Sequence, residues 1–415
     1  MKRVAFVFVA IFSVFSQTCA DDVSLPLGGY FHPGRAMPVK WNVTAPESPD
    51  ATVQISASDA ITTYISSNNP HGIAPWIAID PNAGNLHWRS SSGAAGEISG
   101  LHPLDESDFL VGTTDAGDPH LSALFPNRRL IPIHLDPEDL QSPAMAWETL
   151  DAILLTSDEW QKLPTTLRRG LFAEGITLAV AGGPQPDALF LWHRSDQSWI
   201  ASPELKVPPI IDADVYSPTD GWPAGRSTAF RRRILLFGAI YCLIACGTCL
   251  WRSRWTAAAF VAMTIIAAAA FALDNAYQSP IFHRSGTVLL YDQLPYQDIW
   301  LYQVSHQPAD FHLPVEGFVH PVFEDASQPD LMKLKLECDA NGNPIAISGH
   351  LPPDEPLALM SRQLAADNRE DSAIPPATSP LLRLAKSIYP QFQIAGELPN
   401  STQEQIWPTI VLTRR

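Results

Sequence analysis

The chain has 415 residues, with 43 acidic and 27 basic side chains and a formal net charge of −16 at pH 7. Binding to nucleic acid needs clustered Lys and Arg that neutralise phosphates, so this acidic balance argues against nucleic acid as a partner. The 38 prolines favour turns, loops and edge strands over long soluble helices.

The first 20 residues have the pattern of a secretory signal peptide. Lys2 and Arg3 precede an apolar run over residues 4–15, and a short polar segment ends at Ala20. Cys19 leaves a lipoprotein signal open as an alternative, although the residues before it fit that type poorly. The pattern predicts cleavage after Ala20 and export of the chain that follows.

Residues 21–104 contain short β-branched runs separated by Gly, Pro and Asn. Runs of this kind are typical of strands joined by tight turns. We therefore predict a small antiparallel β-sandwich for this part of the chain. Its four histidines are too widely spaced to form the ligand pair of a metal site, and no cofactor is expected.

Residues 105–204 change to an alternation of strands and helices. The predicted strands cover residues 109–113, 130–135, 151–156 and 177–180, and a helix is predicted over residues 164–174. Pro164 opens that helix and Gly175 closes it, while the run 151–156 (DAILLT) is compact and apolar, as in a buried parallel strand. This alternation predicts a doubly wound α/β domain.

The segment AMAWETLDAILLTSDEWQKLPTTLRRGLFAEGITLAVAGG resembles the central part of the class I glutamine amidotransferase-like, flavodoxin-like domains of bacterial membrane-anchored proteins. The resemblance covers roughly residues 105–200 and ends in the pattern G-x-x-L-x-V-x-G-G. It implies a nucleophilic cysteine in a turn after a strand, activated by a histidine. The equivalent turn here is Ala181-Gly182-Gly183-Pro184, and residues 21–230 contain no cysteine. We therefore expect a degenerate fold, a pseudoenzyme.

Four residues near the strand ends are the candidate ligand-binding residues: Ser157, Asp158, Gly182 and Gly183. Ser157 beside Asp158 could replace the missing nucleophile with His134 or His193 as the base, but Ser and Asp after a strand more often cap the next helix. The glycine pair allows close approach of a ligand to the backbone, or simply makes the turn. No catalytic residue and no metal ligand is therefore assigned.

After a Pro- and Gly-rich connector over residues 205–233, two apolar runs of 18 residues each, 234–251 and 256–273, flank a short turn. At about 1.5 Å rise per residue, each would span roughly 27 Å, close to the hydrocarbon thickness of a bilayer. They predict a transmembrane helical hairpin. With the signal peptide, the hairpin predicts a multi-pass inner-membrane protein whose folded parts are extracytoplasmic, although four arginines before the first span oppose the positive-inside tendency.

Three cysteines, Cys242, Cys246 and Cys249, share one face of the first predicted span. A soft metal could bind there, but we favour close helix packing, because Gly238, Cys242 and Cys246 form a row of small residues. Outside the predicted spans and the signal peptide, Cys338 is the only cysteine, so no disulfide is expected within the exported parts.

Residues 274–415 form a predicted β-rich domain. Strands are expected over residues 287–291, 299–304, 333–338 and 345–348, with Asn341-Gly342 turning a hairpin between the last two and a helix near residues 380–388. The spacing of His306, His312 and His320 does not fit a metal site.

Together these features predict a multidomain α+β membrane protein. Its parts are a β-sandwich, a flavodoxin-like α/β domain, a two-helix transmembrane hairpin and a C-terminal β-rich domain. The expected function is that of a non-catalytic binding or scaffold protein of the bacterial cell envelope, with the lipid bilayer and an envelope protein as partners. Two alternatives stay open: an accessory subunit of an envelope transport or assembly complex, and a serine- or metal-dependent amide hydrolase.

Overall fold

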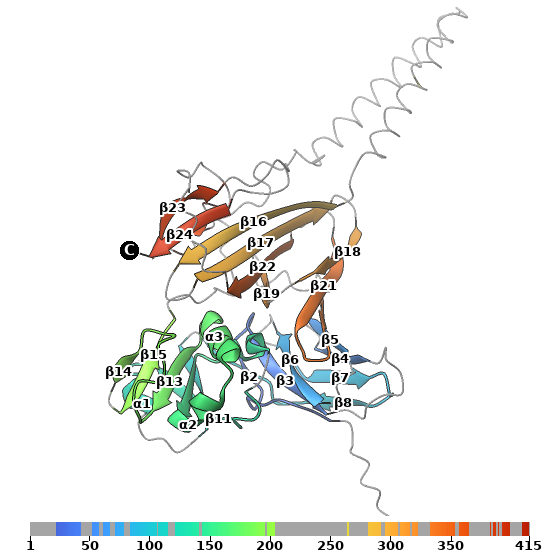
Figure 1. The fold of residues 1–415 in the computed structure, drawn as a ribbon. Coiled ribbons are helices and arrows are strands. Elements are labelled where there is room, and N and C mark those ends of the chain that lie inside the picture. The colour runs from blue at the N-terminus through green and yellow to red at the C-terminus, as the bar shows by residue number, and fades with distance from the viewer. Residues whose placement is uncertain are drawn as a thin grey trace, which may run out of the picture.

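A computed structural model describes two parts of the chain (Figure 1). The first comprises residues 22–42, 52–57, 61–66, 71–78, 84–105, 107–114, 121–140, 143–195 and 197–203. The second comprises residues 281–291, 295–305, 308–315, 318–322, 333–352, 357–364, 392–398 and 409–414, with single positions 264, 382, 385, 386 and 389.

The structure contradicts the predicted membrane-protein fold class and the multi-pass inner-membrane localisation. Over the described ranges strands predominate, and no helix there is long and apolar enough to cross a membrane. The corrected class is a mostly β chain with one α/β sheet. The predicted signal peptide (1–20), connector (205–233) and hairpin (234–273) lie outside the described residues, apart from Thr264.

Two sheets of the N-terminal part pack face to face. One has the order β1-β3-β6, and β4, β5, β7 and β8 belong to the other. The bounds are β1 (Asp22–Ser24), β3 (Ala36–Asn42), β6 (His71–Ile77), β4 (Thr52–Ser56), β5 (Thr62–Ser66), β7 (Leu86–Ser90) and β8 (Ala95–Ile98); a short parallel pair joins β2 (Tyr30–Phe31) to β9 (His102–Pro103).

Burial alternates along these strands as a half-buried sheet requires. Val53 and Ile55 of β4 are fully buried, while Thr52 is exposed and Gln54 is partly exposed. Between the sheets, the Thr63 hydroxyl of β5 donates a hydrogen bond to the Pro75 carbonyl of β6 at 3.0 Å. The sequence predicted an antiparallel sandwich formed by residues 21–104 alone, and the strand order corrects this prediction.

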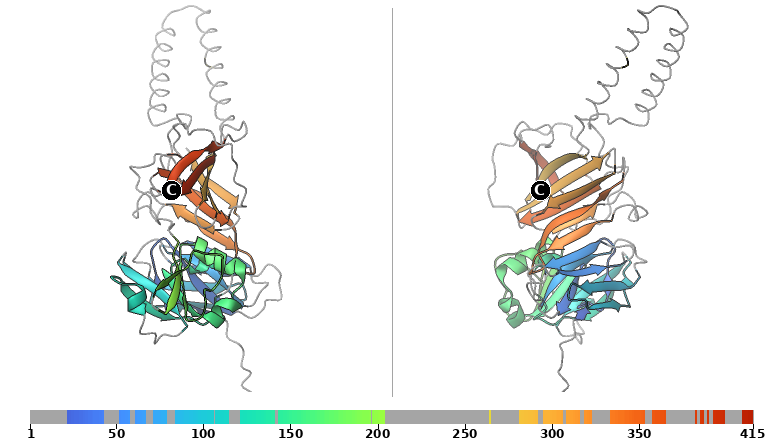
Figure 2. Two further views of the ribbon diagram at one scale, coloured as in Figure 1. Left: turned by 60° about the vertical axis from the view of Figure 1, so that its left-hand side comes forward. Right: turned by 90° about the vertical axis from the view of Figure 1, so that its right-hand side faces the viewer.

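The second of these sheets takes three of its strands from the C-terminal part. Its full order is β18-β21-β20-β5-β4-β7-β8, where β18 is Ala309–Pro314, β20 is Lys335–Cys338 and β21 is Pro344–Leu351. Strand β20 pairs in parallel with β5, with Leu336 opposite Thr63. Figure 2 shows the orange strands lying beside the blue ones. Segments from the first and last predicted domains therefore share one hydrogen-bonded sheet.

The turn between β20 and β21 packs closely on β6. Asn341-Gly342 does turn this hairpin, as predicted, and Gly342 has a φ of +83°. The Asp339 carboxylate accepts hydrogen bonds from the backbone N–H groups of Asn341 and Asn343, both at 2.8 Å. A Cβ at Gly342 would lie 2.0 Å from the Ile73 carbonyl oxygen, so the turn fits against β6 only with glycine.

The α/β part is one six-stranded sheet in the order β11-β10-β12-β13-β15-β14, whose first four strands are parallel. The strands are β10 (Asp108–Thr113), β11 (Arg129–His134), β12 (Ala152–Thr156), β13 (Thr177–Ala181), β14 (His193–Ser195) and β15 (Ser198–Ala201); the helices are α1 (Leu121–Leu124), the 3-10 turn η1 (Ala144–Trp147), α2 (Ser157–Lys162) and α3 (Thr165–Ala173). The four parallel strands and α3 match the predicted elements closely.

A buried carboxylate ties this sheet to the N-terminal strands. Oδ2 of Asp151 lies 3.0 Å from Nε2 of His32 and accepts a hydrogen bond from the Leu110 backbone at 2.9 Å, while Arg35 donates to Oδ1 at 3.3 Å. Three donors on one buried carboxylate meet the condition under which a buried charge is tolerated. His32 and Asp151 therefore form a structural joint at the amino end of β12.

The C-terminal part adds a second six-stranded sheet, in the order β19-β22-β17-β16-β24-β23. Its strands are β16 (Ile281–Tyr291), β17 (Pro295–Ser305), β19 (Phe318–Val322), β22 (Leu357–Leu364), β23 (Phe392–Leu398) and β24 (Thr409–Arg414). All pairings are antiparallel except β16 with β24. The α3 helix contacts β22, so the α/β sheet and this sheet also meet.

Candidate functional site

The predicted site lies at the carboxyl ends of the parallel strands β10, β12 and β13. From β10 the chain passes to β11 on one side and later to β12 on the other, so the direction of winding reverses between β10 and β12. Open α/β sheets bind ligands at such a reversal, outside the carboxyl ends of their strands. At this edge Thr114 directly follows β10, Ser157 directly follows β12 and Gly182 directly follows β13.

Helix α2 starts at this edge with a complete capping box. The Thr156 hydroxyl accepts a hydrogen bond from the Glu159 backbone, and the Glu159 carboxylate accepts one from the Thr156 backbone at 2.8 Å. Oε2 of Glu159 also accepts from the Thr114 hydroxyl at 2.8 Å, which links the ends of β10 and β12.

The same contacts fix the charge of Glu159. Burial alone would raise the pKa of this carboxyl, but the hydrogen bonds from Thr156 and Thr114 and the nearby Lys162 hold the pKa below its usual value. Glu159 is therefore a charged carboxylate committed to holding two strand ends together, which is a structural role.

Ser157 and Asp158 form the first turn of α2. Asp158 is exposed, and a carboxylate in the first turn is favoured by the helix dipole. Ser157 is partly buried and faces the Gly183 turn, where a Cβ added to Gly183 would lie 3.1 Å from its Oγ. The structure therefore brings Ser157 and Gly183 together, as expected for residues of one edge.

The Gly182-Gly183 turn presents backbone to solvent. Both glycines are exposed and have positive φ, +70° and +73°. The Gly182 N–H donates to the Gln197 carbonyl at 2.9 Å, and Nε1 of Trp199 donates to the Gly183 carbonyl at 3.3 Å. A Cβ at Gly182 would meet nothing within 4 Å, so this position is open to an approaching group.

Neither histidine weighed as a base reaches Ser157. His134 is level with Thr113 of β10 and Leu154 of β12, so two strand spacings, roughly 10 Å, separate it from the strand that leads to Ser157. His193 is on β14, three strands away from β12. Strand order therefore keeps both imidazoles apart from the Ser157 hydroxyl.

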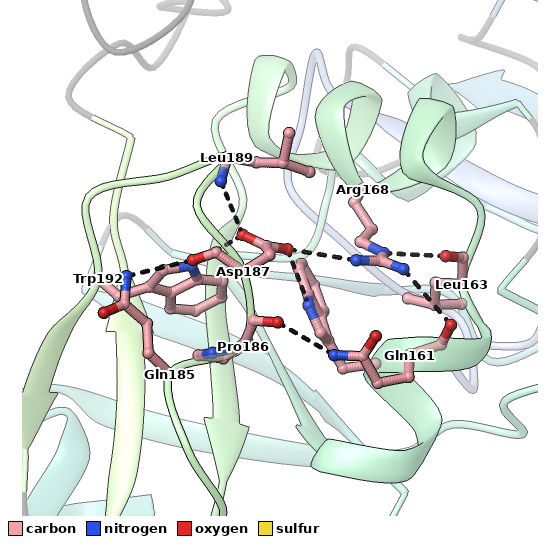
Figure 3. A network of polar contacts seen from close by, with 9 residues as sticks. Gln161, Leu163, Arg168, Gln185, Pro186, Asp187, Leu189 and Trp192 are labelled. Carbon is pink, nitrogen blue, oxygen red and sulfur yellow. Dashed lines mark hydrogen bonds and ion pairs between the residues drawn. The ribbon is translucent and has the colours of Figure 1, made fainter.

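A polar network that sequence reasoning missed holds the loop between β13 and β14 (Figure 3). Oδ2 of Asp187 accepts hydrogen bonds from Nε1 of Trp160 at 3.1 Å and from Arg168 at 3.2 Å. Oδ1 accepts from Nε1 of Trp192 and from the Leu189 backbone, both at 3.0 Å. The four donors come from α2, α3 and the loop itself, so Asp187 fixes the path of the chain beyond Gly183.

Aromatic rings surround this carboxylate. Trp160 and Trp192 meet edge to face with centroids 5.4 Å apart, and the Arg168 guanidinium lies 5.1 Å above the Trp160 ring. In the sequence, two tryptophans and an arginine occur near Asp187. Their spacing does not indicate that they contact this aspartate in the folded chain.

No group of His, Cys, Asp and Glu within the described ranges is arranged to hold a metal ion. Of the three C-terminal histidines, His312 pairs with Glu337 at 3.6 Å on an exposed strand face, and His306 lies outside the described residues. Cys338 is buried and free, and burial with the adjacent acidic residues raises the pKa of its thiol well above the usual range. The predicted membrane cysteines Cys242, Cys246 and Cys249 lie outside the described residues.

Comparisons with known proteins gave no relative that helps to interpret this site. No protein-family model, no curated protein and no solved structure matched the chain.

Proposed function

We propose that this chain is a non-catalytic binding or scaffold protein that meets its partner at the carboxyl edge of the parallel sheet. The observation that carries the proposal is the exposed Gly182-Gly183 turn after β13, which offers backbone where the resemblance to amidotransferases would place a nucleophile. Ser157 and Asp158 flank this turn at the end of β12. We call these four residues the glycine edge.

Rigidity supports a binding role for the glycine edge. The capping box fixes the start of α2, which begins at Ser157. The Asp187 network fixes the loop that follows Gly183. A surface whose backbone is held in place loses little conformational entropy when a partner binds. Partner recognition by this edge therefore needs no rearrangement of the surrounding loops.

The hydrolase alternative lacks a base at Ser157. A serine nucleophile needs a proton acceptor within about 3 Å, and strand order separates His134 and His193 from its hydroxyl. A water-activating metal would need ligands that the described part of the chain does not group together. These geometries favour binding over amide hydrolysis.

An amidase assay on the purified chain tests the absence of catalysis. We expect no ammonia release from glutamine and no p-nitroaniline release from γ-glutamyl p-nitroanilide above the level of a Ser157→Ala variant. Ser157 is the first residue of α2 and lies outside the buried core, so the variant is expected to fold normally. Turnover by the wild-type chain that Ser157→Ala abolishes would refute the non-catalytic assignment.

Photocrosslinking in cells tests the binding role. With p-benzoylphenylalanine at position 158 we expect a discrete adduct with one partner, because this exposed position belongs to the glycine edge. Asp105 is the matched control, since it is also an exposed aspartate but precedes β10 at the opposite end of the sheet. Equal adducts at both positions, or none at 158, would count against the glycine edge, whereas a transport or assembly component captured only at 158 would favour the accessory-subunit alternative.

A further inference from the structure

The turn between β20 and β21 contains the only Asn-Gly pair of the chain, Asn341-Gly342. An asparagine followed by glycine is especially prone to spontaneous deamidation, because glycine has no side chain to hinder attack of its backbone nitrogen on the asparagine amide. Asn341 is exposed, so water reaches its side chain, whereas Gly342 is buried. Neither residue belongs to the glycine edge.

Deamidation of this pair uses only water and hydroxide as co-reactants. The Gly342 nitrogen gives its proton to hydroxide and forms a bond to Cγ of Asn341. The bond between Cγ and Nδ2 breaks, and Nδ2 leaves as ammonia after taking a proton from water. Water then opens the resulting succinimide ring at either carbonyl. The product is aspartate or isoaspartate, in which the main chain runs through the side-chain carbon.

The hairpin commits the attacking nitrogen to another contact. The Gly342 N–H donates a hydrogen bond to the Asp339 carbonyl at 3.0 Å. The Asp339 N–H donates to the Asn343 carbonyl at 2.9 Å, which closes a three-residue loop with Gly342 in the left-handed region. Loss of the Gly342 proton would break the first of these bonds and leave a negative nitrogen facing a carbonyl oxygen. The folded turn therefore opposes the first step of the reaction.

The Asp339 carboxylate fixes the backbone on both sides of Gly342. Its Oδ1 accepts hydrogen bonds from the N–H groups of Asn341 and Asn343, both at 2.8 Å. Nδ2 of Asn343 also donates to Oδ2 at 3.2 Å. The turn therefore cannot change shape without breaking several hydrogen bonds to one side chain.

The N-terminal part restricts the turn further, because Gly342 lies directly against β6. A Cβ at Gly342 would be 2.0 Å from the Ile73 carbonyl oxygen and 3.2 Å from Cα of Ala74. Ring closure has to rotate the peptide group between Asn341 and Gly342. The closeness of the β6 backbone leaves no room for this rotation while the turn stays in place.

We propose that Asn341 is a deamidation site controlled by the contact between the β20–β21 turn and β6. Asn341 is protected while the turn lies on β6, and it reacts when the turn lifts. Isoaspartate then keeps the turn from returning, because it adds a backbone CH2 group and a carboxylate where Gly342 already touches β6. The modification is independent of the proposed binding role, because this turn is not part of the glycine edge.

Incubation of the full chain in mildly alkaline buffer, followed by peptide mass spectrometry, tests the protection. We expect Asn341 to deamidate at least about tenfold more slowly in the folded chain than in concentrated urea, because the reaction requires local opening. Asn343 is the internal control, since Pro344 has no backbone N–H and cannot form the same succinimide. Equal rates in the folded and unfolded chain, or equal reaction of Asn341 and Asn343 in urea, would overturn the proposal.

Asp339→Ala tests the protection without changing either reacting residue. It removes the acceptor of two hydrogen bonds at 2.8 Å, so deamidation of Asn341 in the folded variant should be about threefold faster or more. Asp310→Ala, at an exposed aspartate on β18 of the same sheet, should keep the wild-type rate. If Asp339→Ala does not fold, the wild-type rate below the unfolding transition should rise with urea. An unchanged rate in folded Asp339→Ala, or a wild-type rate independent of urea, would contradict the protection.

The isoaspartate form, separated from the unmodified chain by ion exchange, tests the structural consequence. We expect hydrogen exchange of residues 71–77, which form β6, to rise by about tenfold or more in this form. Asn341→Asp carries the new charge without the extra CH2 group, so its exchange should stay close to that of the wild type. Equal exchange of β6 in the isoaspartate form and in the unmodified chain would refute the claim that the modification keeps the turn from β6.

Discussion

Replacing Asp298 with asparagine is expected to lower the free energy of unfolding by about 3 to 5 kcal/mol, because it leaves the buried Arg362 guanidinium without its counter-charge. Both guanidinium hydrogen bonds at 2.7 Å lose a charged acceptor, and the Tyr389 hydroxyl loses its carboxylate as well. Urea unfolding monitored by tryptophan fluorescence measures the change, since Trp300 is buried two residues further along β17.

The matched control is Asp310→Asn on β18. This aspartate pairs with His350 at 2.9 Å, but its side chain is 91% exposed. Exposed pairs of this kind contribute roughly 0 to 1 kcal/mol, so the same chemical change should be nearly silent there. If the two variants lost similar stability, the buried Arg362–Asp298 pair would not contribute the stabilisation that its geometry indicates.

The second large effect is expected at Gly342. Gly342→Ala should lower the free energy of unfolding by roughly 2 to 5 kcal/mol, because it combines a left-handed backbone conformation with a steric conflict. The φ of +83° disfavours a side chain, and its Cβ would lie 2.0 Å from the Ile73 carbonyl oxygen. The β20–β21 turn would then have to move away from β6. The same unfolding assay measures the loss.

Gly93→Ala separates the two causes of that loss. Gly93 lies in the turn between β7 and β8 with a φ of +96°, but a Cβ there meets nothing within 4 Å. Gly93→Ala should lower the free energy of unfolding only through the unfavourable left-handed backbone conformation, by about 1 to 2 kcal/mol. Equal losses in the two variants would mean that the β20–β21 turn is not seated on β6.

The alternation of elements in the α/β part could be predicted because each strand is a compact apolar run between turn residues. Residues 151–156 and 177–180 were placed to within a residue or so of β12 and β13, and Gly175, with a φ of +84°, ends the α3 region as expected. Local sequence carries such information, since burial on both faces requires an apolar run and a left-handed turn favours glycine.

The pairing of distant strands could not be predicted. The alternating pattern of residues 333–338 predicted a strand with one exposed face. Hydropathy does not specify that β20 pairs in parallel with β5, where Leu336 lies opposite Thr63, 273 residues earlier in the chain.

 Pairing over such a distance depends on which sheet edges remain open after local folding, and this is a property of the assembled molecule.

The membrane prediction failed for a related reason. Apolar length alone predicted the hairpin, which lies outside the described residues, and the helices that the structure does describe are short segments elsewhere in the chain. Hydropathy reports how apolar a segment is, whereas fold class depends on how the rest of the chain pairs, and the described segments pair mainly as strands.

The candidate site was predictable in part. Ser157 and Gly183 follow neighbouring parallel strands, so their approach follows from the order of β12 and β13. The Asp187 network was missed because its donors lie on α2, α3 and a loop, and their meeting depends on how those elements pack. The Arg362–Asp298 pair was missed because its members are 64 positions apart on paired strands.

The N-terminal and C-terminal parts form one body through a shared sheet, and a disulfide across the two strands where they meet provides the sharpest test. Tyr64 and Glu337 are opposite each other on β5 and β20, within the Cα separation of roughly 4.4 to 6.8 Å that a disulfide spans. The double variant Tyr64→Cys with Glu337→Cys should form this link under mild oxidation, as identified by mass spectrometry of the joined peptides. Gln54→Cys with Glu337→Cys, one strand further away, should not form it. Absence of the link between positions 64 and 337 in the folded protein, or equal linking of both pairs, would contradict the shared sheet.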